Sequence, residues 1–268
     1  MIVKNDNLNK SALAGLLGVS RQYLYYKHLQ NEKDWKLKVR IEEVLHNYPS
    51  YGYRRIAQYL KINKKPIQRV MRMFGLRAYR RRGRKFKKNK HQSEISYPNL
   101  LLQTMPQYPN HIWATDFTYL WFKDRFIYLC TVIDLFTRNI VGFSLSAKHD
   151  RWLVTTAFLD ALRYNPRPEI LHSDHGKEYV SEDYDNLVTE LNITRSMSRP
   201  GCPWENGYQE GFYSQFKVDL GDPSRFDSLG ELTAEIYQTI YCYNHKRIHS
   251  ALGTSPLEFA KRHVFAYN

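Results

Sequence analysis

Residues 113–120 have the sequence Trp-Ala-Thr-Asp-Phe-Thr-Tyr-Leu, an apolar and β-branched run that predicts a buried strand with Asp116 in its middle. A second short apolar run ends at Asp174, just before a glycine turn. A third acid, Glu210, lies in residues 204–217, which have helical periodicity. An unpaired buried charge is expensive, so carboxylates at strand ends are poor structural choices and indicate a functional site.

Three carboxylates that converge on one point can hold hard divalent cations, which prefer oxygen ligands. Two such ions about 3.5–4 Å apart can activate a nucleophilic oxygen and stabilise the leaving oxygen in phosphoryl transfer. The three acids therefore predict a nuclease or a nucleotidyl transferase that uses Mg²⁺ or Mn²⁺, with two ions per active site.

Four sequence blocks resemble the OrfB-type DDE transposases of bacterial insertion sequences, the IS-three family, which are related to retroviral integrases. The resemblance covers nearly the whole chain from about residue 40, and the ordered set is highly specific because thirty-five residues separate Asp174 from Glu210. The blocks, with a further one upstream, are residues 113–118 (WATDFT), 172–179 (HSDHGKEY), 196–207 (SMSRPGCPWENG), 243–256 (YNHKRIHSALGTSP) and 51–56 (YGYRRI).

The resemblance implies an α/β fold with an RNase H-like mixed-sheet core, in which Asp116, Asp174 and Glu210 are both the catalytic residues and the metal ligands. It implies a DNA transposase that cleaves the ends of an insertion sequence and catalyses strand transfer. Glu205 is the alternative third acid, but only Glu210 precedes the Phe-Tyr pair that the family places after its third acid. Glu205 stands where the family commonly has Asp.

Three further departures from the family pattern are Lys177, Glu178 and Gly211. None of them is a catalytic acid, so they bear on contacts with DNA rather than on the class of reaction. Two residues near Glu210 are supporting candidates. The family often has a cation at the position of Lys217, where it contacts DNA near the cleaved phosphate, although a solvated lysine is the alternative. Asn206 would orient the Glu210 carboxylate or contact DNA.

Two other functions compete with an active transposase. One is a non-catalytic DNA-binding protein derived from a transposase, and the other is an RNase H-like nuclease that acts only by hydrolysis. The first has no physical reason to retain three costly charges. The second gives no role to the DNA-binding modules predicted upstream of the core.

The excess of positive over negative charge lies entirely in the first part of the chain. The formal net charge is +14; residues 1–98 hold 24 Lys and Arg against 6 Asp and Glu, whereas residues 99–268 hold 16 against 20. This division predicts a nucleic-acid-binding arm joined to an acidic catalytic domain. The resemblance implies that the partner is double-stranded DNA, both the terminal inverted repeats and the target. Hydrophobic residues at 43% and aromatic residues at 15% argue against global disorder.

The three cysteines show no pairing pattern and indicate a reducing compartment. No cysteine precedes Cys130, which excludes the His/Cys zinc module found at the start of retroviral integrases. The chain shows neither a signal-peptide hydrophobic region nor an apolar run of membrane-spanning length. We expect a cytoplasmic, nucleoid-associated bacterial protein with no membrane partner.

We expect residues 1–36 to form a helix-turn-helix, 37–78 a second helix-turn-helix module, 79–110 a basic linker, and 111–268 the RNase H-like catalytic core. In the first module, Leu13, Leu16 and Leu17 would make an apolar face and Ser20 would cap the next helix. An ordinary helical hairpin is the alternative to DNA binding there. The outward-facing candidates for DNA contact are Arg21, Gln22 and Tyr25.

The second module is predicted to have helices at 37–47, 53–60 and 65–74. Its candidate DNA contacts are Gln68, Arg69 and Arg72 on the third helix, together with Arg54 and Arg55. The last two would instead pack their stems against Tyr48 or Tyr51 if they are structural. From 77 to 90, nine of fourteen residues are Lys or Arg, which predicts tracking along DNA phosphates rather than a solvated tail. The candidate contacts in this run are Arg80, Arg81, Arg82, Arg84 and Lys85.

In the core, strands are predicted at 112–121, 125–133, 139–146, 169–173 and 193–197, and helices at 151–163, 180–191, 204–219 and 228–245. Asp134 is expected to cap a hairpin turn rather than to join the catalytic acids. The block after the last of these helices would close the core or bind DNA, and the sequence does not decide between the two. Its members are Tyr243, Asn244, Arg247 and His249.

An insertion sequence has two ends, so joining both to one target requires at least two active sites held together. We therefore expect a dimer or higher oligomer on DNA. In the family that the chain resembles, an upstream partner reading frame often supplies another helix-turn-helix and a leucine zipper, sometimes by frameshift fusion. No sustained leucine heptad is present here, so the chain alone is expected to be largely monomeric.

Overall fold

A computed structural model describes residues 10–25, 29–80, 97–199 and 202–264 of the chain. Its core is a five-stranded sheet with the strand order β3-β2-β1-β4-β5. β1, β2 and β3 are antiparallel neighbours, whereas β4 and β5 continue the sheet in parallel with β1. The mixed sheet predicted from the sequence is confirmed, and each strand boundary lies within one residue of the prediction. The strands are β1 (Ile112–Phe122), β2 (Arg125–Asp134), β3 (Ile140–Ser146), β4 (Ile170–Ser173) and β5 (Thr194–Met197).

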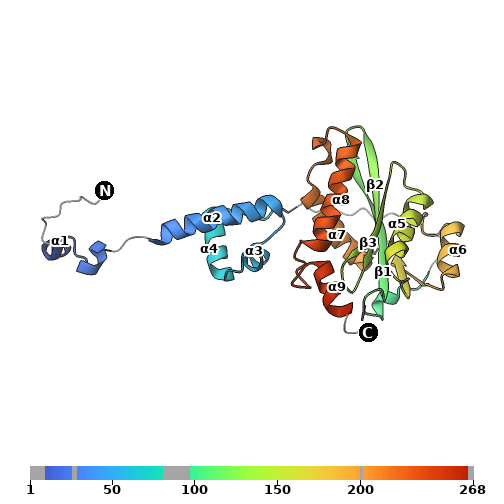
Figure 1. Cartoon of the computed structure of the whole chain (residues 1–268), viewed down its shortest axis with the longest axis horizontal. Helices are drawn as coiled ribbons and strands as arrows, with labels where there is room; N and C mark the ends of the chain where they lie inside the picture. Colours follow the sequence, from blue (N-terminus) through green and yellow to red (C-terminus); the bar gives the residue numbers. More distant parts are fainter. Residues whose placement is uncertain (1–9, 26–28, 81–96, 200–201, 265–268) are drawn as a thin grey trace.

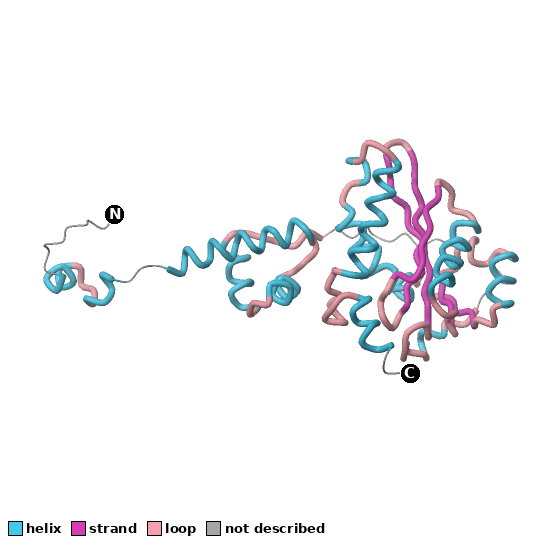
Figure 2. The backbone as a smooth tube through the Cα atoms, viewed as in Figure 1, coloured by secondary structure: helices cyan, strands magenta, loops and turns pink. Residues whose placement is uncertain are grey.

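Helices cover both faces of the sheet, as Figure 1 shows. Alternate side chains of β1 point to opposite faces. Ile112 and Ala114 therefore join one hydrophobic core with α7 (Gly207–Leu220) and α8 (Leu229–His245). Trp113 joins a second core on the other face, where α5 (Arg151–Tyr164) and α6 (Glu182–Glu190) pack. Figure 2 shows the strands enclosed between these two helical layers.

The predicted core helices are observed with small changes at their ends. A short 3₁₀ turn, η3 (Pro203–Asn206), precedes α7, so the α-helix begins three residues after its predicted start. Gly142 of β3 allows α5 to lie close to the sheet. A Cβ atom at position 142 would overlap the backbone of Ala157 and Ala161 in α5. Further short elements were not predicted: α9 (Pro256–Val264), η2 (Leu100–Leu102) and η4 (Pro223–Arg225).

Three helices before the core form a separate unit around their own apolar centre: α2 (Leu29–Asn47), α3 (Tyr53–Leu60) and α4 (Lys64–Met73). The predicted start of the first at residue 37 is wrong, because the helix begins eight residues earlier. Asp34 accepts hydrogen bonds from Gln30 and from Arg69 of α4, so the early turns already pack against the module. The boundary expected at 36/37 thus falls inside α2.

The first described segment differs from the expected helix-turn-helix. It contains α1 (Lys10–Leu16) and the single 3₁₀ turn η1 (Arg21–Tyr25) in place of a second α-helix. Leu16 is 86% exposed and Leu17 is 60% exposed, so the predicted apolar face does not pack against a core in the described residues. A helix of seven residues is too short to bury such a face without a larger partner.

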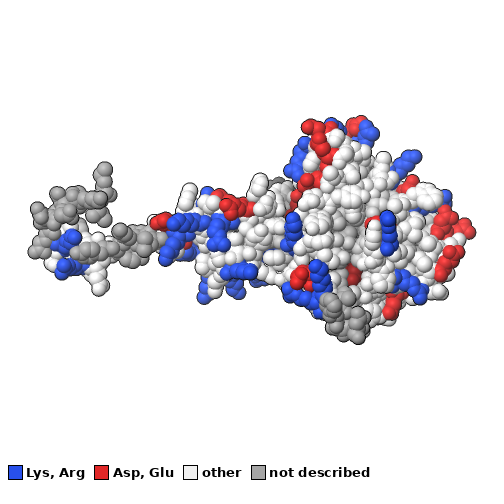
Figure 3. Space-filling view, in the orientation of Figure 1, with Lys and Arg blue, Asp and Glu red and all other residues white. Residues whose placement is uncertain are grey.

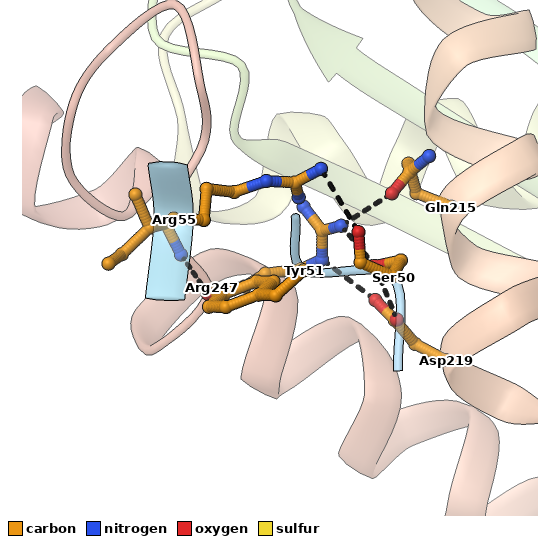
Figure 4. A network of polar contacts seen from close by, with 7 residues as sticks. Ser50, Tyr51, Arg55, Gln215, Asp219 and Arg247 are labelled. Atoms are coloured by element: carbon orange, nitrogen blue, oxygen red, sulfur yellow. Dashed lines mark hydrogen bonds and ion pairs between the residues drawn. The ribbon is translucent and has the colours of Figure 1, made fainter. Parts of the chain in front are cut away.

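The three-helix module is bound to the catalytic core by a polar network (Figure 4). Arg247 donates from Nε to Asp219 Oδ2 at 2.7 Å and from Nη2 to Ser50 Oγ at 2.9 Å. The Tyr51 hydroxyl accepts a hydrogen bond from the backbone N–H of Ile248 at 2.7 Å. Of the block that the sequence left undecided, Arg247 therefore joins the module to the core.

Two neighbours of Arg247 close the core in different ways. Tyr243 is buried among the side chains of α7 and α8, and Asn244 bonds both the N–H and the carbonyl of Ile140. The described part of the expected linker also belongs to the core, because Leu100 N donates to Ser196 Oγ. No helix of the described residues is long and apolar enough to cross a membrane.

Candidate active site

The pairing of β1 with β4 brings two of the predicted acids to the same level of the sheet. Ala114 is the parallel partner of His172, and Asp116 and Asp174 each follow two residues later. Adjacent strands lie about 4.8 Å apart, and residues two apart on a strand share a face. Because Ala114 contributes to the core beneath α7, Asp116 points to the face that α7 covers.

The third acid is brought to this face by hydrogen bonds from α7 to the sheet. Gln209 is fully buried, and its Nε2 donates to the carbonyls of Ala114 at 2.7 Å and Thr131 at 3.1 Å. Tyr213, one turn later, donates from its hydroxyl to the carbonyl of Asp116 at 2.6 Å. Glu210 lies between these two anchors and is exposed.

The charges of the other two acids affect the pKa of Asp116. Burial raises the pKa of Asp116 well above its ordinary value, and the negative charges of Asp174 and Glu210 raise it further. The N–H of Phe117 and the ammonium group of Lys217 act in the opposite direction. Burial also raises the pKa of Asp174, whose Oδ1 accepts a hydrogen bond from Gly176 N at 2.9 Å.

Carboxylate oxygens are the ligands that a hard divalent cation prefers, so these three acids would suit such an ion. In the parts of the chain that the structure describes, no three Asp, Glu, His or Cys side chains already surround one point closely enough to hold a metal ion. Glu210 is the exposed member of the set, so its side chain is the one with freedom to move toward the two aspartates.

Asn206 lies four residues before Glu210 and is only 4% exposed. Neither its amide nitrogen nor its amide oxygen has a hydrogen-bond partner, which is costly for a buried polar group. Lys217 lies two turns after Glu210, and its Nζ is 5.1 Å from the centre of the Tyr119 ring. The charge of Lys217 lowers the pKa of Asp116.

Glu205, the alternative third acid, has a structural role. Its carboxylate accepts from Arg199 Nε at 2.6 Å and from Asn99 Nδ2 at 2.7 Å, so its charge is already compensated. The turn assignment for Asp134 also agrees with the structure, because this residue accepts from Phe136 N and Thr137 Oγ1. Burial lowers the pKa of His172 to about 4, which makes it a neutral core residue bonded to Ser196.

The candidate DNA contacts lie mostly on the outer surface of the helical region. Lys and Arg side chains gather over α2 to α4, whereas Asp and Glu gather over α6 (Figure 3). Arg69 pairs with Asp34, at 2.5 Å. The exposed candidates are Arg21, Gln22, Arg54, Gln68, Arg69, Arg72 and Arg80. Arg81, Arg82, Arg84 and Lys85, with the side chain of Tyr25, lie outside the described residues.

Arg55 is placed differently from the other candidates. Its guanidinium carbon is 5.0 Å from the centre of the Tyr51 ring, and Nη2 donates to the carbonyl of Ser50. This agrees with the packing role that the sequence left open. Two positioning residues were missed altogether, Gln209 and Tyr213. Their one signal in the sequence is the four-residue spacing that places both on the turn of helix around Glu210.

The comparisons with known proteins agree with this arrangement. Two family models, each described as an integrase core domain, match residues 106–203 and 191–256. The transposase for insertion sequence element IS904 of Lactococcus lactis is 35% identical over 236 residues, which are 84% of this chain and 93% of that protein. The putative transposase InsK for insertion sequence element IS150 of Escherichia coli is 32% identical, with 88% of each chain covered.

A solved structure supports the fold alone. The chain resembles a chain in the cryo-EM structure of the simian T-cell lymphotropic virus intasome in complex with PP2A regulatory subunit B56 gamma. The TM-score is 0.53 at 17% identity, and the match covers 81% of this chain and 73% of that chain. The identities to the curated relatives over most of their length confirm the resemblance carried by the motifs. The chain therefore belongs to the transposases of insertion sequences that carry an integrase core domain, and it is a DNA transposase acting by the integrase-type mechanism.

Proposed function

We propose that Asp116, Asp174 and Glu210 are the catalytic metal ligands and that two Mg²⁺ or Mn²⁺ ions are held between them. The observation that supports this assignment most directly is the β1–β4 register, in which Asp116 and Asp174 each lie two residues beyond the paired Ala114 and His172. The charges of Asp174 and Glu210 also raise the pKa of Asp116. Three carboxylates gathered without a compensating cation are destabilising, and divalent ions would relieve this repulsion. Bound ions would activate the attacking oxygen and stabilise the leaving oxygen.

The chain's own residues would hold and orient the reacting DNA. Asp116 and Asp174 are fixed by the sheet, and Glu210 would close the ligand set from the first turn of α7. The Lys217 ammonium, near the acids, would contact a phosphate beside the cleaved bond. Asn206, with both amide atoms lacking partners, would accept or donate a hydrogen bond to DNA or to Glu210.

The reaction would have two steps on double-stranded DNA. Water attacks a phosphodiester at the end of the element and frees a 3′-hydroxyl, which then attacks a phosphodiester of the target. No covalent bond between protein and DNA forms in either step. The module of residues 29–80 and the basic run after it would bind the terminal repeats, with Arg54, Gln68, Arg69 and Arg72 as contacts. Arg21 and Gln22 would add contacts from the first segment.

We also propose that the chain works as a dimer or higher oligomer on DNA in the bacterial cytoplasm, in association with the nucleoid. Terminal-repeat DNA, or an upstream partner protein fused by frameshifting, would bring the protomers together. Light scattering of the chain with and without end DNA tests this. A stable dimer in the absence of DNA would contradict it.

Cleavage of a labelled terminal repeat tests the catalytic assignment. Asp116→Asn should abolish metal-dependent cleavage and leave DNA binding near the wild-type level, because it removes a ligand charge and no DNA contact. Asp124→Asn is the matched control: this exposed aspartate lies in the turn of the same β1–β2 hairpin and should cleave normally. Retained cleavage by Asp116→Asn would refute the assignment. Hydrolysis without joined product would instead indicate a nuclease.

A further inference from the structure

A pocket of about 380 Å³ lies at the junction of the three-helix module and the catalytic core. It is lined by Arg55 of α3, Arg138 of the β2–β3 turn, Tyr208 of α7, and Arg247 and His249 of the segment after α8. Its volume falls in the range of roughly 300–1,000 Å³ that is usual for ligand pockets. Glu210 does not line it, so the pocket occupies a different face of the helix from the catalytic acid.

The lining of this pocket is strongly cationic. It contains three arginines and no acid. Arg247 is compensated by its ion pair with Asp219, but Arg55 and Arg138 form no ion pair with any residue that the structure describes. The pKa of Arg55 is lowered by burial and then by the charge of Arg247, which shows that these positive charges repel one another. Such a cluster is stabilised by an anion.

Two members of the pocket have buried nitrogen atoms without partners. Nε and Nη1 of Arg138 make no hydrogen bond, and neither does Nδ1 of His249. Buried polar groups without partners cost free energy, and in native proteins they commonly mark a place for a ligand, water or ion. Burial, followed by the charges of Arg138, Arg247 and Arg55, lowers the pKa of His249 to about 4. The unpartnered imidazole is therefore neutral near pH 7.

The guanidinium group of Arg138 is held in place before any ligand arrives. Its central carbon is 4.0 Å from the centre of the Tyr208 ring, a cation–π contact that fixes the plane of the group. Its backbone has a φ of 62°, and its N–H donates to the carbonyl of Asp134 at 2.8 Å. Arg138 is thus a preorganised donor without a protein acceptor, which lowers the cost of binding an anion.

We propose that this pocket binds a phosphate group of the DNA backbone, with Arg138 and His249 as the donors and Arg55 supplying further positive charge. This inference rests on the proposed action of the chain on double-stranded DNA. The pocket combines α3 of the module with α7 of the core, so a strand bound there runs between the recognition helices and the catalytic helix. A planar guanidinium held over an aromatic ring suits a phosphate oxygen.

The test is the salt dependence of DNA binding by the full chain in metal-free buffer, measured by fluorescence anisotropy with a labelled duplex of arbitrary sequence. Arg138→Gln should reduce the slope of log affinity against log salt by about 1, the loss of one phosphate contact. Between 50 and 200 mM salt, the variant would then lose about 3.5-fold less affinity than the wild type.

Arg163→Gln is the control, because Arg163 is also an arginine stacked on a tyrosine, but it is exposed and lies on the other face of the sheet. It should bind as the wild type does. If Arg138→Gln fails to fold, Ser250→Glu replaces it, since it adds a negative charge to the exposed rim of the pocket without removing any contact of Arg138. Ser250→Glu should weaken binding of the duplex.

The other possible results separate the pocket proposal from the proposed function. Equal slopes for Arg138→Gln and Arg163→Gln overturn the pocket as a phosphate site on DNA, whereas failure of the wild type to bind the duplex contradicts the proposed function itself. Inorganic phosphate is the second probe, and its binding is measured as a change in thermal unfolding. If it stabilises the wild type but not Arg138→Gln while the DNA slopes stay equal, the pocket binds a free phosphate and the DNA proposal is overturned.

Discussion

The hydroxyl group of Tyr213 donates a hydrogen bond of 2.6 Å to the backbone carbonyl of Asp116, so the helix that carries Glu210 is attached directly to the strand that carries the first acid. The same hydroxyl accepts from Thr131 Oγ1 at 2.9 Å. Tyr213 thereby fixes both the distance and the rotation of α7 over the sheet. The geometry of the proposed site depends on a residue that touches no substrate.

Tyr213→Phe should reduce cleavage while leaving DNA affinity unchanged, because it removes one of the two side-chain links from α7 to β1 without altering a carboxylate. Loss of buried hydrogen bonds should lower the free energy of unfolding by about 1–3 kcal/mol. Urea unfolding and the cleavage rate measure the two effects. Tyr164→Phe, at an exposed position on α5, is the control. Full cleavage by Tyr213→Phe would show that its hydrogen bonds do not position the acids.

The assignment of the third acid can be tested by comparing two neighbouring glutamates. Glu210→Gln should abolish cleavage and preserve stability, because Glu210 is exposed. Glu205→Gln should preserve the chemistry but lower the melting temperature, because the Glu205 carboxylate pairs with Arg199 and accepts from Asn99. The reverse pattern would identify Glu205 as the catalytic residue.

The basic run should dominate the salt dependence of DNA binding. If six or so phosphates are neutralised, affinity should fall by roughly a thousandfold between 50 and 200 mM salt. Changing Arg81, Arg82, Arg84 and Lys85 to serine should flatten this dependence, as measured by anisotropy. These four positions leave intact the hydrogen bond from Tyr79 N to Pro49 O. An unchanged slope would mean that the run is a solvated linker.

Arg247→Met should destabilise the folded protein by about 3–5 kcal/mol, because it leaves the Asp219 carboxylate without its buried partner. Arg225→Met is the control, since Arg225 is 54% exposed and its 3.7 Å pair with Glu235 should contribute about 0–1 kcal/mol. Thermal unfolding measures both. If the double change Arg247→Met with Asp219→Leu were as damaging as the single change, an unpaired Asp219 charge would not be the cause.

The contribution of His249 to the free energy of unfolding should fall on mild acidification. Burial and the charges of Arg138, Arg247 and Arg55 lower the pKa of His249 from 6.5 to about 4, so the unfolded chain binds a proton more readily than the folded one. His249 makes its full contribution to the free energy of unfolding above pH 6.5. This contribution is lost as the pH falls to about 4, and the loss is roughly 3 kcal/mol at most. His249→Gln should flatten this part of the profile in urea unfolding. An unchanged profile would contradict the pKa.

The strands of the sheet, and the positions of Asp116 and Asp174 relative to them, could be predicted from the sequence because both depend on local patterns. The apolar and β-branched run around Asp116 predicted a buried strand, and Asp174 directly follows the short apolar run that forms β4. Leu16 and Leu17 were misread because periodicity reveals an apolar face but not whether anything covers it. The early start of α2 was missed because it depends on the contact between Asp34 and Arg69, which are far apart in the chain.

The cationic pocket could not be found from the sequence for a related reason. Arg55, Arg138 and His249 come from three distant segments, and nothing in the sequence indicates that they line one pocket. Arg138 is an ordinary turn residue until the structure shows its stacking on Tyr208. The expectation of an RNase H-like core followed from motifs, whereas the residues that support the acids become visible only when the chain is folded.

The polar network at Ser50 restricts how the DNA specificity of this transposase could be exchanged. A chimaera that received residues 29–80 from another member of the family would lose the one acceptor for Arg247 that the module supplies, unless the donor also had a hydroxyl at the equivalent of Ser50. It would also need a tyrosine to receive the N–H of Ile248. The three-helix module and the core are therefore best exchanged as a matched pair. If the module recognises DNA as proposed, new specificity is better sought by changing exposed side chains of α4.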